Sequence, residues 1–447
     1  MNRSELTQNV DTIVVVMMEN RSFDHVLGHL RHPRYGNRPE VDGIEDTGNP
    51  AYLNPNTDGV GVAPAFMDDT AFESDLPHDR SAVATQLAYA PVSGSFLMNG
   101  FVQAFENERH SSVDRPPVMG LLTPQSLPTT GALAAQYTVC DRWFACLPTS
   151  TAPNRLMSMC GDTRIDDTGT LLPEQTTVYD WLLDHGVRWR VYAAGLPFLT
   201  LMLRVAPLLL TSHFRRLDEL KRDVLDDPAD SWPQVIFIEP DYYDCPIHLQ
   251  APCDNHAPLA MAPGEAFLGQ VYGWLTSHPA RWARTVLVVT YDEHGGFFDH
   301  VAPLPVKYRN PQAGVSFDST GPRVPAIVAG PFAPQGVSHA PLDNTSILQL
   351  LAERFGRPGE PYSPSVLGRA ATMASVSAVL TATAANTAIA AVAPRPASGS
   401  ASPSPQGSSN LRAAFDGAMQ NLVSRHQSVA VAKYPELRGY SGCPIGR

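Results

Sequence analysis

Two apolar runs that end in acidic residues constrain this chain more than any other feature of its sequence. Residues 13–18 read Ile-Val-Val-Val-Met-Met and lead directly into a glutamate and an asparagine. Residues 285–291 read Thr-Val-Leu-Val-Val-Thr-Tyr and lead into an aspartate and a glutamate. Continuous β-branched runs are typical of strands buried on both faces, as in a parallel sheet covered by helices. We therefore predict an α/β fold with both runs as buried strands.

The polar residues that follow the two runs are candidate metal ligands: Glu19, Asn20, Asp292 and Glu293. Open α/β sheets bind their ligands at the carboxyl ends of the strands, which is where these residues would lie. Carboxylate and amide oxygens are ligands for hard or borderline divalent cations. Two adjacent carboxylates at a strand end repel each other unless a cation or a proton lies between them. A solvated turn is the alternative, but it does not explain two acids directly after a buried strand.

A third polar motif lies between these two strand ends in the sequence. Residues 149–155 read Thr-Ser-Thr-Ala-Pro-Asn-Arg, which offers a hydroxyl nucleophile, a rigid proline and an arginine able to bind an anion. The alternative is a Ser/Thr-rich loop that caps a helix beginning near Pro153. The two interpretations are compatible, because a helix N-terminus beneath the hydroxyl would also attract a phosphate.

Strand and helix patterns alternate along most of the chain. Further strand-like runs are residues 187–193, 235–238 and 324–329. Helical patterns are residues 178–185, 265–278 and 345–356. This alternation predicts a three-layer fold, with a mainly parallel central sheet and helices on both faces. Residues 31–75 are rich in Gly, Pro, Asn and Asp and are expected to form long loops over the site.

Three blocks of the sequence resemble those of a known family. They read Glu-Asn-Arg-Ser-Phe-Asp-His at residues 19–25, Thr-x-Pro-Asn-Arg at 151–155 and Asp-Glu-His-Gly-Gly-Phe-Phe-Asp-His at 292–300. They are similar to blocks of the phosphoesterase family, which contains bacterial acid phosphatases, bacterial phospholipases C and plant non-specific phospholipases C. The resemblance extends from about residue 10 to about residue 356. It implies an alkaline-phosphatase-like fold and metal-assisted hydrolysis of phosphate esters through a covalent phospho-enzyme.

The resemblance implies a role for the residues of the middle block. Thr151 corresponds to the nucleophile, which is Ser or Thr in the family, and metal coordination would activate its hydroxyl. The neighbouring hydroxyls of Ser150 and Thr149 are alternatives one or two residues away. Asn154 would contact the substrate phosphate or hold the loop, and Arg155 would bind an anion or form a structural ion pair.

The resemblance also implies a metal cofactor. Glu19, Asn20, Asp292 and Glu293 match the metal-binding blocks and would hold one divalent cation, with Asn20 also contacting the substrate. Oxygen-rich ligation favours calcium, magnesium or manganese and leaves zinc open.

Three histidines are candidate catalytic residues. His78 lies in a segment that resembles the family's Asp-Pro-Gly-His, with Leu-Pro in place of Pro-Gly, and would contact the phosphate. His256 lies in a segment that resembles Asp-Asp-His-Pro and would protonate the leaving oxygen or bind the phosphoryl group. His213 resembles a further family histidine. The histidines inside the longest blocks are expected to orient the ligands: His25, His294 and His300.

The expected domains follow from a change in composition after residue 356. Residues 1–370 are expected to form the catalytic phosphoesterase domain. Residues 371–410 are dominated by Ala, Ser, Thr and Pro and are expected to form a linker, although residues 378–392 could be helical. Residues 411–447 are expected to form a helical tail, whose first helix, at residues 411–426, would dock on the body or on a partner.

Charge and cysteine content narrow the classes of function. The chain has 447 residues, a formal net charge of −12 and no Lys/Arg-rich run, so nucleic acid is not an expected partner. An acidic enzyme that acts on phosphate esters needs a local cation, in agreement with the predicted metal site. The six cysteines include no CxxC pair, so a structural zinc site is not expected. Cys245 and Cys253 could form a disulfide in an exported protein, and free thiols are the alternative.

The N-terminal residues give no sign of an export signal. Residues 1–11 are polar, and the apolar run after them has only six residues. It lacks the basic start, the longer apolar core and the cleavage site of a signal peptide, and it is too short to span a bilayer. A cytoplasmic location is the default expectation, and export by another route stays open.

The expected substrate is a phospholipid or a small-molecule phosphate ester. We expect phospholipase C-type cleavage of glycerophospholipids, with acid phosphatase activity on phosphomonoesters as the alternative. Residues 192–210 are unusually apolar and would form either a lip in transient contact with a membrane surface or a buried segment. An alternative of another class is a non-catalytic metal-binding or lipid-binding protein on the same scaffold. Such a protein would be expected to lack the nucleophile or a metal ligand, whereas this chain has candidates for both. A sulfatase would need Cys or Ser where this chain has Thr151.

Overall fold

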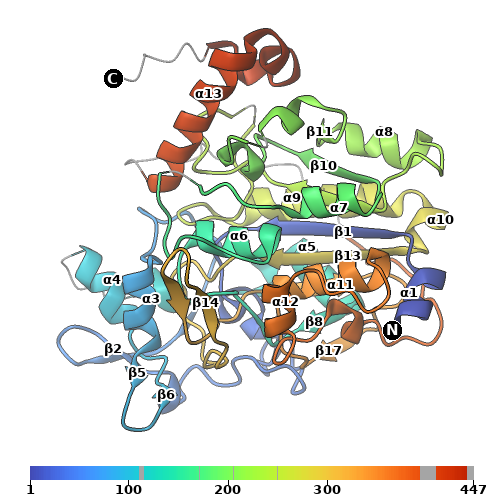
Figure 1. Ribbon diagram of the computed structural model, residues 1–447. Coiled ribbons are helices and arrows are strands. Elements are labelled where there is room, and N and C mark those ends of the chain that lie inside the picture. Colours follow the sequence, from blue (N-terminus) through green and yellow to red (C-terminus); the bar gives the residue numbers. More distant parts are fainter. Residues whose placement is uncertain (110–114, 171, 205, 249, 393–408, 440–447) are drawn as a thin grey trace.

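An eight-stranded sheet forms the centre of the computed structural model (Figure 1). The structure describes residues 1–109, 115–170, 172–204, 206–248, 250–392 and 409–439. The strands lie in the order β11 (Phe214–Arg216), β10 (Trp189–Ala193), β12 (Val235–Glu239), β1 (Thr12–Met18), β13 (Thr285–Tyr291), β16 (Ala326–Ala329), β8 (Thr138–Cys140) and β17 (Gly336–Ser338). Within it, β16 runs antiparallel to β13 and β8, and the other pairs are parallel. The predicted α/β fold with a mainly parallel sheet is therefore confirmed.

Helices cover the sheet in two groups that are defined by their mutual contacts. One group is α5 (Pro128–Gln136), α8 (Glu219–Asp226), α9 (Ala262–Thr276) and α10 (Pro279–Trp282). The other is α1 (Arg3–Asn9), α6 (Thr151–Cys160), α11 (Thr345–Phe355) and α12 (Pro364–Arg369). The remaining helices are α2 (Phe23–Leu27), α3 (Arg80–Leu87), α4 (Phe101–Arg109), α7 (Val178–Asp184) and α13 (Asn410–Lys433).

Short strand pairs lie outside the central sheet. They are β2 (Asn54–Pro55) with β3 (Gly61–Val62), β4 (Ala65–Met67) with β7 (Gly120–Leu122), β5 (Tyr89–Ala90) with β6 (Ser95–Phe96), β9 (Trp143–Phe144) with β18 (Leu342–Asp343), and β14 (Tyr308–Asn310) with β15 (Val315–Phe317). Apart from β2, β3, β4 and one short 3₁₀ turn, residues 31–75 contain irregular loops, in agreement with their composition.

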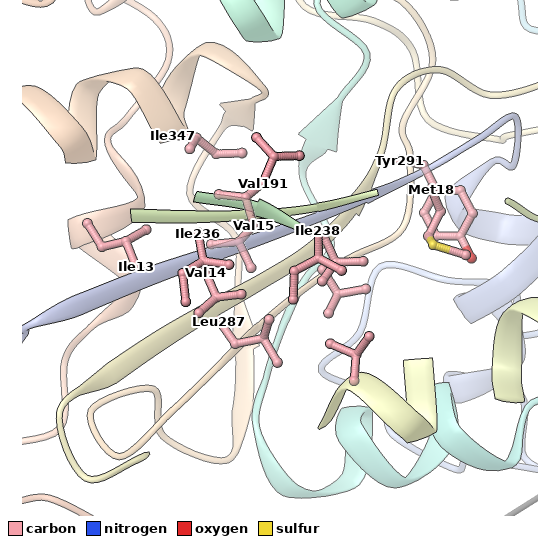
Figure 2. Packing of buried hydrophobic residues seen from close by; sticks show 14 of the residues in the cluster. Ile13, Val14, Val15, Met18, Val191, Ile236, Ile238, Leu287, Tyr291 and Ile347 are labelled. Carbon is pink, nitrogen blue, oxygen red and sulfur yellow. The ribbon is translucent and has the colours of Figure 1, made fainter. Parts of the chain in front are cut away.

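The two apolar runs form neighbouring strands at the centre of the core. All residues of β1 and β13 are buried, and their side chains pack with those of β12 (Figure 2). Full burial of one such side chain stabilises a fold by about 1.5–3 kcal/mol. The parallel register pairs Met18 with Tyr291, so both strands end at the same edge of the sheet. The acidic residues that follow them are therefore brought together.

Most of the predicted elements are present, with boundary shifts of a few residues. The strands at 12–18 and 285–291 have the predicted limits, and the helix predicted at 345–356 ends one residue earlier. Three strands of only three residues each were not predicted: β8, β11 and β17. The helix considered at 378–392 is wrong: a 3₁₀ turn at Val376–Val379 is followed by irregular chain, because this Ala/Thr segment has no periodic apolar face to bury.

The C-terminal region packs against the body. In the described part of the expected linker, Met373, Val376 and Leu380 are buried, and residues 393–408 lie outside the described residues. The predicted tail helix is α13, which is longer than expected and has a break at His426. Its buried side chains dock it on the body: Leu411, Phe415, Met419 and Leu422.

The apolar segment 192–210 is largely core rather than lip. Tyr192, Leu196, Phe198 and Leu209 are all buried, and Phe198 packs edge-on against Phe415 of α13. Of the two alternatives considered for this segment, these residues favour the buried one, and Leu203 is the large apolar side chain of the described segment that is exposed.

The described cysteines are unpaired, Cys245 and Cys253 among them. Across the described residues, none of the helices has the length and apolar character that crossing a membrane would need.

Candidate active site

The ends of β1 and β13 are joined by a tight backbone contact. Asn20 has a positive φ of 58°, and its backbone N–H donates to Asp292 Oδ1 at 3.2 Å. Gly295 allows this close approach, because a Cβ at this position would lie 2.1 Å from the Asn20 carbonyl oxygen. Only glycine fits this position, so the sequence fixes how closely the two motifs meet.

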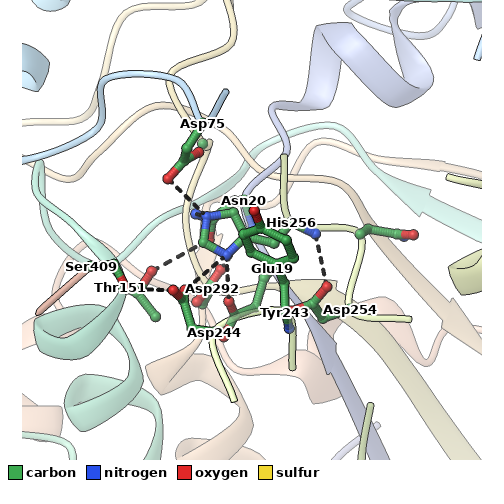
Figure 3. Close-up of polar contacts among 12 residues, drawn as sticks. Glu19, Asn20, Asp75, Thr151, Tyr243, Asp244, Asp254, His256, Asp292 and Ser409 are labelled. Atoms are coloured by element: carbon green, nitrogen blue, oxygen red, sulfur yellow. Dashed lines mark hydrogen bonds and ion pairs between the residues drawn. The ribbon is translucent and has the colours of Figure 1, made fainter. Parts of the chain in front are cut away.

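Arg155 lies between two of the predicted metal ligands. Its Nη2 is 3.1 Å from Glu19 Oε1, and its Nε is 3.1 Å from Asp292 Oδ2 (Figure 3 shows these two carboxylates). The buried guanidinium also lies over the rings of Phe198 and Tyr242, at 5.4 and 5.3 Å from their centroids. These contacts correspond to the structural ion pair considered for Arg155.

Burial raises the pKa values of two of these carboxyl groups. Burial, and then the charge of Asp292, raise the pKa of Glu19. Burial raises the pKa of Asp292 to about 6, although Arg155 opposes the shift. Buried carboxylates at this spacing are unfavourable unless positive charge offsets them. Arg155 pairs with both groups, and His256 Nδ1 lies 3.2 Å from Glu19 Oε2.

The donor atoms of the cluster fit a divalent cation. Glu293 Oε1 is buried and makes no hydrogen bond in the described structure, whereas Glu19 Oε2 lies 3.2 Å from His256 Nδ1. Anionic oxygen is the donor that hard cations prefer. Among the described residues, three sets of side chains have ligand atoms within 4.8 Å of one another: Glu19, Asp244 and His256; Asp75, His78 and His256; and Asp24, Asp299 and His300. The chain therefore contains groups able to bind a metal ion.

Thr151 is the hydroxyl that faces this cluster. It is the first residue of α6, it is buried, and its Oγ1 lies 3.4 Å from Asn20 Oδ1 (Figure 3). The hydroxyl of Ser150 instead bonds to Thr168, and that of Thr149 donates to the carbonyl of Asp166. Among the three hydroxyls of this motif, the contacts with Asn20 therefore favour Thr151.

Asn154 does not reach the cluster. Its Nδ2 donates to the carbonyls of Leu147, Thr149 and Ser150, and its Oδ1 accepts from the Leu147 N–H. Both ends of the amide are thus used to hold the loop that carries Thr151. Substrate contact by Asn154 is corrected to a structural role, because a saturated amide has no donor left for phosphate.

His78 and His256 lie on the opposite side of Asn20 from Asp292. The Asn20 Nδ2 atom is 2.8 Å from His256 Nε2 and 3.3 Å from His78 Nε2. Burial opposes the charged form of His78, but the carboxylates of Asp75 and Glu293 outweigh it and raise its pKa to about 9. The pKa of His256 is also raised well above its usual value, against burial, chiefly by Asp75.

Two acidic residues of the site were not predicted. Asp75 Oδ2 is 3.2 Å from His256 Nε2, and Asp244 Oδ2 is 3.4 Å from His256 Nδ1. Asp75 lies three residues before His78, in the segment that resembles the family's Asp-Pro-Gly-His. The sequence therefore contained a signal that could have identified Asp75 as a site residue. Asp244 lies in the loop after β12, and a strand end followed by acids was the only sequence signal for it.

His213 lies near the amino-terminal ends of the parallel strands, at the opposite end of the sheet from the cluster. This position corrects its predicted catalytic role. It precedes β11, and its ring stacks on Trp189 at 4.1 Å, with Nδ1 3.0 Å from the Trp189 carbonyl. Trp189 begins β10, a strand parallel to β1, whereas the cluster lies where the parallel strands end. His213 is therefore left out of the site.

The other block histidines have separate partners. His294 Nδ1 is 3.2 Å from Glu293 Oε2, which suits the predicted orienting role. His25 bonds to Arg21 and to the Gly120 carbonyl. His300 bonds to Asp24, whose other oxygen pairs with a buried arginine. Only His294 among these three contacts a predicted ligand side chain in the described structure.

Comparison with known proteins defines the class to which this fold and site belong. The Phosphoesterase family matches residues 10–358, which is most of the chain. The chain therefore belongs to the Phosphoesterase family.

Relatives within this class are named as phospholipases. Non-specific phospholipase C1 of Arabidopsis thaliana is 35% identical over 361 residues, covering 74% of this chain and 63% of the relative. Hemolytic phospholipase C of Pseudomonas aeruginosa is 28% identical over 430 residues, covering 81% and 55%. Phospholipase C B of Mycobacterium tuberculosis is 28% identical over 421 residues, covering 78% and 74%. The chain thus spans less than two thirds of the length of the plant relative.

Solved structures give weaker likenesses. A protein in the alkaline phosphatase superfamily from Vibrio parahaemolyticus has a TM-score of 0.34 and 11% identity, covering 53% of this chain and 61% of that chain. Phosphonate monoester hydrolase of Agrobacterium radiobacter has a TM-score of 0.36 and 11% identity, covering 77% and 74%.

Proposed function

We propose that this chain hydrolyses phosphate esters with Thr151 as the nucleophile, and that its substrates are glycerophospholipids cleaved as by a phospholipase C. The observation that carries the proposal is the buried Thr151 hydroxyl, which faces Asn20 among three carboxylates. Family membership and the names of the relatives support phosphate esters as the substrate class.

One divalent cation is the proposed cofactor, with ligands drawn from Glu19, Asn20, Asp292 and Glu293. The buried Glu293 Oε1, which makes no hydrogen bond in the described structure, supports this assignment. When bound, such a cation stabilises the alkoxide form of a hydroxyl and offsets charge on the phosphoryl oxygens. Its donor set suits calcium, magnesium or manganese, and zinc is compatible.

In the proposed reaction, Thr151 Oγ1 loses its proton to solvent water and attacks phosphorus in line with the departing alcohol oxygen. The bond from phosphorus to Oγ1 forms as the bond to the alcohol oxygen breaks. An imidazolium proton from His256 passes to the alcohol, which leaves as diacylglycerol when the substrate is a glycerophospholipid. Water then attacks the phospho-threonine, gives a proton to the now neutral His256 and releases the phosphorylated headgroup. The bond from phosphorus to Thr151 Oγ1 breaks in this second step, and Oγ1 takes up a proton from solvent.

His78 and His256 are proposed to bind the phosphoryl oxygens. Their raised pKa values keep both rings charged near neutral pH. Charged donors placed where negative charge develops stabilise the transition state more than the bound substrate. The Asn20 side chain lies beside both rings.

The proposal is tested by hydrolysis of p-nitrophenyl phosphorylcholine and p-nitrophenyl phosphate, with and without chelator. Thr151→Ala is expected to lose activity by at least about 10³-fold, because the substitution removes the hydroxyl that attacks phosphorus. Ser150→Ala is the matched control, since that hydroxyl points to Thr168 and is expected to stay active.

Each outcome has a defined meaning. Chelator-sensitive turnover that is lost in Thr151→Ala supports the proposed site. Preference for the diester supports phospholipase C activity, and preference for the monoester identifies an acid phosphatase. Full activity in Thr151→Ala contradicts the nucleophile assignment.

A further inference from the structure

Exposed apolar side chains are concentrated on two neighbouring hairpins. Eleven large hydrophobic residues are exposed in the described structure, and five of them lie on the β2–β3 and β5–β6 hairpins or directly beside them. These five residues form what we call the hairpin surface: Leu53, Val60, Tyr89, Val92 and Leu97. Val92 at the tip of the second hairpin is fully exposed. Such clustering is uncommon on a soluble monomer and marks a site of interaction.

The two hairpins are held together at their bases. The side chain of Asn54 in β2 is buried, accepts from the Phe101 N–H at 2.9 Å and donates to the Met98 carbonyl at 3.4 Å. The Tyr89 and Phe96 rings pack at 5.0 Å across the second hairpin. The bases are therefore anchored while the tips project from the body beside α3 and α4 (Figure 1). Hairpins with anchored bases can insert their apolar tips into another surface without unfolding.

The charge pattern of the hairpin surface identifies the kind of partner. Residues 81–105 contain no charged residue and no histidine, and residues 47–67 contain only Asp58. An anionic surface would be recognised by clustered Lys and Arg, which are absent from both stretches. An uncharged apolar surface instead fits the headgroup region of a zwitterionic membrane, where Tyr, Val and Leu are stable.

The hairpin surface is also connected directly to the site. His78 is followed by α3, which is capped by Asp79 and ends at Ala88, and β5 begins with the next residue. Eight helical residues span about 12 Å. A membrane held at the hairpins would thus lie close to the loop that carries His78.

We propose that the hairpin surface docks this protein on a zwitterionic phospholipid bilayer, with Val92, Tyr89 and Leu97 inserted among the headgroups. This inference rests on the proposed function for the identity of the lipid substrate. We favour the hairpin surface over residues 192–210 as the membrane contact, because most described apolar side chains of that segment are buried. Docking would present the substrate phosphate to the site without a membrane-spanning segment.

The test measures flotation of the full chain with phosphatidylcholine vesicles. Val92→Asp is expected to weaken binding by about tenfold or more, because a charge replaces an apolar side chain that leaves water on docking. Leu225→Asp is the control, since Leu225 is also exposed (46%, against 104% for Val92) and lies on α8, away from the hairpins. Turnover of the soluble p-nitrophenyl phosphorylcholine is expected to be unchanged in both variants.

The outcomes separate this inference from the proposed function. Equal vesicle binding by wild type and Val92→Asp overturns the docking surface, whatever the enzyme does with soluble substrates. Sedimentation that shows a dimer dissociated by Val92→Asp, with no vesicle binding, would also overturn it and assign the surface to self-association. Vesicle binding that depends on Val92, in a protein with no turnover, would support docking and count against the catalytic proposal.

Discussion

The candidate site has two walls that are built in different ways. The strand-end wall consists of Glu19, Asn20, Asp292 and Glu293, directly after β1 and β13. The loop wall consists of Asp75, His78, Asp244 and His256. The first wall is fixed by the sheet register and by backbone hydrogen bonds to a carboxylate. The second is fixed by contacts between side chains that are far apart in the sequence.

The two walls also differ in charge, and this difference suggests a division of labour. The strand-end wall has three buried carboxyl groups, two of which contact the Arg155 guanidinium, and such a set of oxygens suits a cation. The loop wall alternates acids with histidines whose pKa values are raised, which suits it to phosphoryl oxygens. Substitutions in the first wall should therefore affect metal binding and activity together, whereas those in the second should affect activity alone.

Glu19→Gln is expected to have the largest effect among variants of the two walls. It removes one carboxylate charge without changing shape, so the bound cation loses an anionic ligand. We expect the metal content after dialysis to fall and kcat/KM for p-nitrophenyl phosphorylcholine to drop by at least about 10²-fold.

The control for this variant is Glu239→Gln. Glu239 is also a buried glutamate at the end of a neighbouring strand, but its carboxylate accepts from Phe198 N–H and the Tyr242 hydroxyl. It is expected to keep its metal. Retention of metal by Glu19→Gln, or its loss from Glu239→Gln, would contradict the assignment of the strand-end wall.

Asp75→Asn is expected to have an intermediate effect that depends on pH. The Asp75 carboxylate raises the pKa of both His78 and His256, so these rings stay charged to higher pH. Without it, the rings lose their protons at lower pH, and the alkaline limb of the kcat/KM profile should move to lower pH. We expect about tenfold lower activity above neutral pH, with unchanged metal content.

Glu73→Gln is the control for this pH profile. Glu73 lies two residues before Asp75, but it is exposed and pairs with Arg109. Its removal is expected to leave the alkaline limb in place. An unchanged pH profile in Asp75→Asn would show that Asp75 does not control the charge of the two histidines.

The strand-end wall was more predictable from sequence than the loop wall. A buried strand ends where its apolar run ends, so Glu19 and Asp292 could be placed at one edge from the pattern alone. His78 and His256 were found through family resemblance, and Asp244 was missed. Contacts across loops depend on tertiary packing that no local periodicity encodes.

Two predicted roles show that resemblance to a family pattern does not by itself place a residue in the active site. Asn154 belongs to the same block as Thr151, yet its amide is saturated by the loop carbonyls. His213 precedes a strand rather than following one, so a parallel sheet places it at the opposite edge from Glu19. The direction of each strand and the local hydrogen bonds decide which polar residues reach the site.

Ser409→Ala is expected to have the smallest effect and to act only through the loop wall. Ser409 Oγ donates to Asp244 Oδ1 and accepts from the Arg412 N–H at the start of α13. Its loss should destabilise the helix start by about 1 kcal/mol and loosen Asp244 beside His256. We expect kcat/KM to fall by less than about fivefold, with metal content unchanged. Ser424→Ala, which removes an exposed hydroxyl from the same helix, is the control and should leave activity unchanged. If Ser409→Ala lowered metal content as Glu19→Gln is expected to do, the two walls would form one cooperative unit and the division between them would fail.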